Sequence, residues 1–70
     1  MWVDIATGHE KAVHDAVRAM PAVKLAHQVT GEHDLVVLID SPAENDIGVV
    51  VQSIRKLPNV VDTITELVLS

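Results

Sequence analysis

The residues between positions 29 and 34 have the clearest potential for chemistry in this sequence. The segment reads Val-Thr-Gly-Glu-His-Asp. Its glycine lets a ligand approach the backbone, amides beside it can hold a carboxylate, and a side-chain carboxylate can accept hydrogen bonds from an ammonium group. This combination indicates a site for a zwitterion, although a solvated hairpin turn explains the same residue types. The candidate ligand-binding residues are Thr30, Gly31, Glu32, His33 and Asp34.

Two threonines near the end of the chain, Thr63 and Thr65, complete the candidate site. They stand two residues apart on an expected strand, and their hydroxyls can reach the same cleft from a neighbouring subunit. Threonine also favours strands for steric reasons, so a purely structural role stays open.

The four histidines form no pattern that favours a metal or a catalytic base. His9 and His14 do not share a helix face, and His27 and His33 flank a turn without a third ligand nearby in the sequence. No Ser-His-Asp arrangement, glycine-rich phosphate loop or carboxylate pair stands out. The sequence therefore predicts no metal site, no cofactor and no enzyme, with the histidines in solvent or at an interface.

Composition narrows the classes of protein further. The 70 residues have a net charge of −5, an apolar fraction of 49%, no cysteine and a single aromatic residue, Trp2. A chain this short forms one domain, residues 1–70, whose small core favours stabilisation by self-association, at least as a homodimer. The acidic balance and the lack of stacking aromatics argue against direct nucleic-acid binding. The longest apolar run, Leu35–Ile39, is too short for a membrane span, so we expect no membrane association and a cytoplasmic location.

The first half of the chain predicts a strand, a helix and a hairpin. Residues 1–7 alternate like a half-buried strand, and apolar residues at spacings of three and four predict an amphipathic helix over 9–20. Thr7 and Glu10 match a capping box at its start, and Pro21 stops it. The helix also offers two surface pairs, Lys11 with Asp15 and Glu10 with His14.

The second half predicts a central strand, a second helix and a last strand. Residues 22–30 and 35–39 indicate a hairpin, and because 35–39 is apolar at every position we expect that strand to be covered on both faces. A second capping box at 41–44 starts a helix that runs to Leu57. Residues 60–69 favour a final strand, with a bulge expected near 64–66.

This order of elements predicts the fold class α+β, a ferredoxin-like βαββαβ sandwich. Two helices cover one face of a four-stranded antiparallel sheet, and the other face stays bare unless a second copy covers it. We therefore expect a sheet-to-sheet dimer, in which Trp2 is a plausible interface anchor.

Four segments resemble the effector-binding domain of the Lrp/AsnC family of transcriptional regulators, often called the RAM domain. The hairpin turn and the Thr-x-Thr pattern of the last strand carry most of the resemblance, which covers nearly the whole chain. The matching segments are Met20–Val23, Leu25–Leu35, Leu57–Val60 and Thr63–Leu69.

The resemblance implies a non-catalytic sensing module for an amino acid or related metabolite. Family members dimerise through their sheets, often assemble into rings of four dimers, and bind the effector between dimers around the hairpin turn. Gly31 and Asp34 match the positions associated with that response, whereas His33 stands where many relatives have an aromatic residue. Relatives begin with a helix-turn-helix domain, so we expect a stand-alone form that acts through its own assembly or by joining full-length regulators of the family.

Three alternatives stay open. The chain can be an oligomerisation scaffold without a ligand, or a small dimeric ferredoxin-like enzyme that uses a histidine such as His27 as its base. The enzyme requires an enclosed pocket between sheet and helices. The third alternative is an ACT-type regulatory domain, whose subunits commonly join their sheets edge to edge, in contrast to the face-to-face contact expected here.

Overall fold

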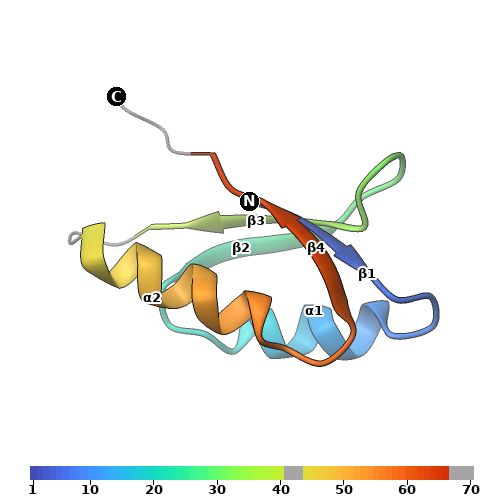
Figure 1. Ribbon diagram of the computed structural model, residues 1–70, viewed down its shortest axis with the longest axis horizontal. Helices are drawn as coiled ribbons and strands as arrows, with labels where there is room; N and C mark the ends of the chain where they lie inside the picture. Colours follow the sequence, from blue (N-terminus) through green and yellow to red (C-terminus); the bar gives the residue numbers. More distant parts are fainter. Residues whose placement is uncertain (41–43, 67–70) are drawn as a thin grey trace.

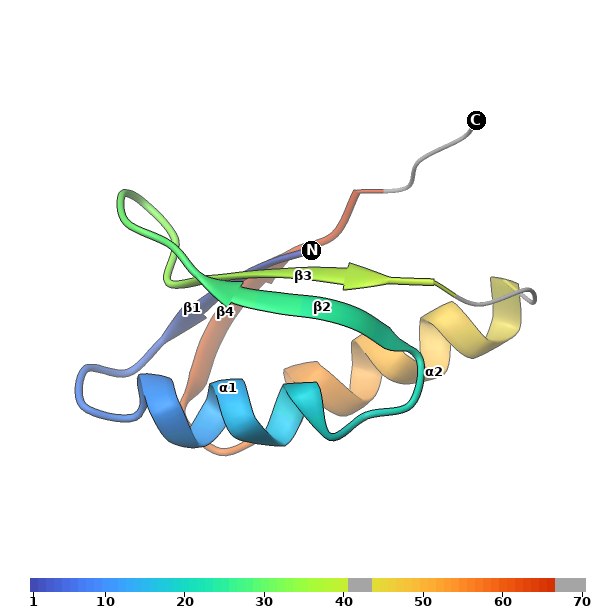
Figure 2. The same ribbon diagram turned by 180° about the vertical axis from the view of Figure 1, so that it is seen from behind.

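The computed structural model describes residues 1–40 and 44–66 and confirms the βαββαβ order. Its strands pair antiparallel in the spatial order β2-β3-β1-β4, with β3 and β1 in the centre. Both helices lie on the same side of this sheet (Figures 1 and 2). The elements are β1 (Trp2–Ile5), α1 (Glu10–Arg18), β2 (Val23–Gln28), β3 (Leu35–Ile39), α2 (Glu44–Arg55) and β4 (Val60–Ile64).

The core fills the space between the helices and the inner face of the sheet. Alternate strand residues point toward the helices, and the predicted apolar stripe of α1 supplies two buried valines. Among the described residues, aliphatic side chains occupy this space. The buried residues are Val3, Ile5, Val13, Val17, Ala26, Leu35, Val37 and Ile54.

The predicted capping box at the start of α1 is wrong. Thr7 and Gly8 form a turn in which the His9 N–H donates to the Ala6 carbonyl at 3.1 Å, and Gly8 has a φ of +91° that a helix excludes. His9 is therefore the N-cap, and its side chain makes no capping hydrogen bond. Glu10 makes a hydrogen bond like the one expected of it in a capping box, since its carboxylate accepts from the Gly8 N–H at 3.0 Å.

The pairing of β1 with β4 contains a bulge, at a different place from the predicted one. Asp4 pairs with Asp62 and Ile5 pairs with Val60, so Val61 has no partner on β1. The expected bulge at 64–66 is wrong, since β4 ends at Ile64. The start of the second predicted capping box, at 41–43, and the predicted end of the strand, at 67–69, fall outside the residues whose structure is described.

The outer face of the sheet, turned away from both helices, carries a patch of apolar side chains. Cross-strand partners share a face, which places Trp2, Val36 and Ile64 in one row and Leu25 beside Leu38 in another. Leu25, Leu38 and Ile64 are 38%, 41% and 46% exposed. The outer face of β3 is thus uncovered in a single copy, as the prediction of a covering partner requires.

Candidate functional site

The candidate ligand loop is the hairpin connection between β2 and β3. It is closed by a hydrogen bond of 3.0 Å from the Val29 N–H to the Asp34 carbonyl. Gly31 has a φ of +112°, which L side chains rarely adopt, and a Cβ built there meets no atom within 4 Å. Thr30, Gly31 and Glu32 are all exposed. The loop therefore presents open backbone and one free-standing carboxylate to a ligand.

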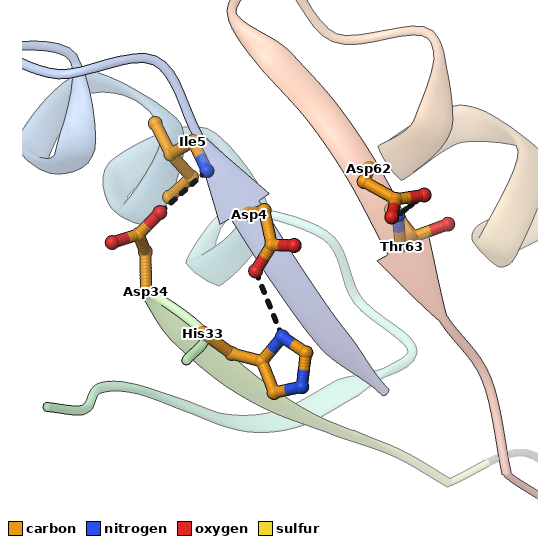
Figure 3. A network of polar contacts seen from close by, with 6 residues as sticks. All are labelled: Asp4, Ile5, His33, Asp34, Asp62 and Thr63. Carbon is orange, nitrogen blue, oxygen red and sulfur yellow. Dashed lines mark hydrogen bonds and ion pairs between the residues drawn. The ribbon is translucent and has the colours of Figure 1, made fainter. Parts of the chain in front are cut away.

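Asp34 ties this loop to the neighbouring strand β1. Its Oδ2 accepts a hydrogen bond of 2.7 Å from the Ile5 N–H (Figure 3). Its own N–H donates to the Val3 carbonyl at 3.1 Å. The sequence singled out Asp34 as an acceptor for a ligand ammonium. The structure adds a second role, because this carboxylate also fixes the end of β1.

His33 turns onto the outer face of the sheet. Its Nδ1 donates a hydrogen bond of 2.8 Å to Oδ1 of Asp4, as Figure 3 shows. The imidazole ring also stacks on the indole of Trp2, with 5.5 Å between centroids and 30° between planes. His33 therefore links the ligand loop to the apolar surface where a partner is expected, and it leaves only Nε2 for other contacts.

The two threonines of the candidate site lie apart from the loop within one chain. Strand β1 separates β4 from β3, and Figure 3 shows Thr63 on the far side of β1 from His33 and Asp34. Thr63 is the partner of Val3, so its side chain lies on the helix side of the sheet. Thr65 is exposed, beyond the end of β4. A single copy does not unite the loop and the threonines into one site.

The remaining histidines have local roles. The Nε2 of His14 lies 2.7 Å from the Ala26 carbonyl and must donate to it, so the expected pair between Glu10 and His14 is wrong. His27 is exposed on the outer face, opposite Val36. Within residues 1–40 and 44–66, no three His, Asp or Glu side chains are placed to hold a metal ion.

The other predicted surface pair on α1 is confirmed. The Nζ of Lys11 lies 2.8 Å from Oδ2 of Asp15. This hydrogen bond, assisted by the charge of the ammonium group, lowers the pKa of the Asp15 carboxyl. The pair is on the helix surface, so it has no part in the candidate site.

Sequence reasoning missed two charged residues beside the candidate residues. Asp4, which holds His33, was read only as a polar position of an alternating strand. Arg55 lies at the end of α2 and lines a surface hollow together with Thr63. Asp4 and His33 are 29 positions apart and meet because β1 and β3 are neighbours in the sheet, whereas Arg55 and Thr63 lie on the consecutive elements α2 and β4.

No helix in the described residues has the length and apolar character needed to cross a membrane.

Comparison with known proteins identifies the family. All 70 residues match the family model for the Lrp/AsnC ligand binding domain. The chain is similar to the crystal structure of FFRP-DM1, with 34% identity and a TM-score of 0.80 over 87% of this chain and 83% of that chain. It is also similar to a hypothetical protein, PHS023, from Pyrococcus horikoshii, with 32% identity and a TM-score of 0.79 over 93% of this chain and 86% of that chain. No curated protein matches it. The chain belongs to the Lrp/AsnC ligand-binding domain family.

Proposed function

We propose that residues 1–70 form one non-catalytic sensing domain that binds an amino acid or a related metabolite between the subunits of an oligomer. The match of the whole chain to a ligand-binding domain family is the observation that carries this proposal. The domain acts in the cytoplasm by changing its own assembly or by joining full-length regulators of the family.

The chemistry of the hairpin loop supports a zwitterionic ligand. The open backbone at Gly31 suits a ligand carboxylate, and the carboxylates of Glu32 and Asp34 suit an ammonium group. Oδ2 of Asp34 already accepts a hydrogen bond from the Ile5 N–H. The same side chain therefore both binds the ligand and stabilises the fold. Glu32 is exposed and carries the greater part of the ammonium recognition.

The outer face of the sheet supports self-association. Three large aliphatic side chains on it are more than a third exposed, and Trp2 and Val36 lie between them. Covering this surface with a second copy removes apolar area from water, which favours a face-to-face homodimer. A ligand that binds between subunits then stabilises the larger assembly by mass action.

Calorimetric titration with each of the twenty amino acids, followed by analytical ultracentrifugation of each mixture, tests the proposal. We expect heat from a small subset, with a rise in sedimentation coefficient for the same compounds. Glu32→Gln weakens this binding about tenfold or more, whereas Asp15→Asn, an exposed carboxylate on α1, serves as the matched control and leaves it unchanged. Absence of heat and of any change in size across the panel contradicts the sensing function.

A second candidate, a scaffold without ligand, has one observation in its favour. His33 and Asp34, two of the candidate ligand-binding residues, already hydrogen bond to β1. A scaffold self-associates equally with and without every amino acid, and Glu32→Gln does not alter its assembly. The sedimentation series above therefore separates the two functions.

A further inference from the structure

A hydrogen-bonded pair of titratable side chains lies beside the apolar patch on the outer face of the sheet. Asp4 points to this face, because its neighbours Val3 and Ile5 are buried on the inner one. His33 meets it there, with 2.8 Å between Nδ1 and Oδ1, and the side chains of His33 and Asp4 are 23% and 28% exposed. His33 also stacks on Trp2, which belongs to the patch. A second copy packed on the patch therefore covers this pair as well.

Covering the pair favours a protonated imidazole. With a neutral His33 the pair carries one negative charge, and burying a net charge costs more than burying a hydrogen-bonded ion pair. With an imidazolium, the charge of Asp4 is balanced and the existing hydrogen bond becomes charge-assisted. The indole of Trp2 adds to this preference, because its ring centroid lies 5.5 Å from that of His33, within the range of a cation–π interaction.

The other carboxylates near His33 favour the same protonation state. Asp62 is the cross-strand partner of Asp4, so strand β4 brings a second acidic residue to that row of the sheet (Figure 3). Glu32 and Asp34 flank His33 in the hairpin loop. Loop, β1 and β4 thus each surround the imidazole with negative charge.

Two further groups that can be cationic lie farther along strand β2. His27 is exposed opposite Val36, and within residues 1–40 and 44–66 its side chain has no hydrogen-bond or ion-pair partner. Lys24 lies at the opposite end of the hairpin from the loop, with its Nζ 3.8 Å from Oδ2 of Asp40. Among the histidines of the outer face, His33 is therefore the one that a carboxylate and an aromatic ring prepare for a positive charge.

We propose that His33 takes up a proton when two copies associate through the outer face of the sheet, so that mild acidification strengthens the assembly. The inference rests on the self-association in the proposed function and adds its regulation by pH. Histidine is the side chain whose charge ordinarily changes between pH 5 and 8. Since each copy contributes one imidazole, a dimer takes up as many as about two protons, and linkage makes its dissociation constant rise with pH.

Measurements on the wild-type chain test the inference without any substitution. Sedimentation velocity at about pH 6, 7 and 8, over a range of concentrations, gives the dissociation constant at each pH. Salt at about 0.5 M screens the repulsion between two copies that each carry a net charge of −5, so the local pair dominates what remains. Calorimetric dilution in phosphate and in Tris, whose ionisation enthalpies differ, counts the protons released on dissociation.

Three variants identify the group that binds the proton. His33→Gln keeps an N–H donor for Asp4 and cannot become charged, whereas Asp4→Asn removes the carboxylate that stabilises the charge. His27→Gln is the matched control, because it removes the other imidazole of the same face. Thermal midpoints at each pH establish that every variant folds.

We expect the wild-type dissociation constant to rise at least about tenfold from pH 6 to 8, with release of up to about one proton per copy on dissociation. The rise falls below about threefold in His33→Gln and Asp4→Asn and is unchanged in His27→Gln. A wild-type constant that is independent of pH or falls as the pH rises, or a rise that survives His33→Gln, overturns this inference and leaves the proposed self-association intact. A wild-type chain that is monomeric at every pH and concentration overturns both.

Discussion

The imidazole of His33 and the carboxylate of Asp4 lie 2.8 Å apart on the outer face of the sheet, although 29 positions separate them in the sequence. The same imidazole stacks on Trp2. The hairpin loop is thus bonded through one side chain to the surface on which a partner copy is proposed to pack. A displacement of the loop therefore moves His33, and with it a side chain of that surface.

We predict that His33 and Asp4 are energetically coupled. His33→Ala and Asp4→Asn each lower the free energy of unfolding, and a double-mutant cycle gives a coupling of about 1 kcal/mol, typical of a half-buried hydrogen bond. Urea unfolding followed by the fluorescence of Trp2, the only tryptophan, measures it. His9→Ala, an exposed histidine, is the control. A coupling within experimental error of zero contradicts the prediction.

Asp34 provides a second test of how the loop is held. Asp34→Ala leaves the Ile5 N–H, on a buried residue, without its acceptor, which costs about 1–3 kcal/mol of stability. Asp34→Asn keeps an oxygen in place, so it loses less. Hydrogen exchange of the Ile5 amide reports the bond directly, and we expect faster exchange in Asp34→Ala. Equal protection in wild type and Asp34→Ala would show that this bond does not hold β1.

The fold could be predicted from the sequence because the apolar residues recur at regular spacings. The fully apolar run at 35–39 became the central strand β3, and the stripe of α1 became core at Val13 and Val17. The predicted cap at Thr7 was wrong for a local reason. Gly8 has a positive φ, so the helix begins only after it. The bulge was misplaced because residues 60–64 alternate too weakly to reveal which one is extra.

The candidate site was predictable only in part, and for a different reason. The residue types of Gly31 and its neighbours are sufficient to predict an open loop. The bonds of His33 and Asp34 to β1 depend on which strands are neighbours, and the position of Arg55 beside Thr63 depends on how α2 packs against β4. Strand order brings together residues far apart in sequence, and no spacing rule along the chain contains that information.

The amino group of Met1 predicts a specific pH dependence. It donates a hydrogen bond of 2.9 Å to the Val37 carbonyl, and desolvation by burial lowers its pKa below 8.0, opposed in part by Glu66. The unfolded chain therefore binds more protons than the folded one between the lowered pKa and about 8. Stability contributed by this group rises with pH across that window and is constant above it.

N-terminal acetylation isolates this contribution, because the acetylated chain keeps an N–H donor and has no charge at Met1. We expect the difference in thermal midpoint between acetylated and free chains to favour the acetylated chain at low pH and to shrink as the pH rises to about 8. All groups other than the terminal amine are the same in both chains, so their contributions to this difference cancel. A difference independent of pH contradicts the lowered pKa.

Self-association through the outer face of the sheet predicts that one charge there dissociates the oligomer. Leu38 is exposed in a single copy and faces outward beside Leu25 on the neighbouring strand, so Leu38→Asp places a carboxylate in the proposed interface. Burying that unpaired charge costs several kcal/mol, which raises the dissociation constant at least about a hundredfold. Sedimentation velocity over a range of concentrations measures the shift toward monomer.

Val49→Asp is the matched control, because Val49 is 65% exposed on α2, away from the outer face. Loss of association in the Val49 variant with retention in the Leu38 variant would place the interface on the helices instead of the sheet.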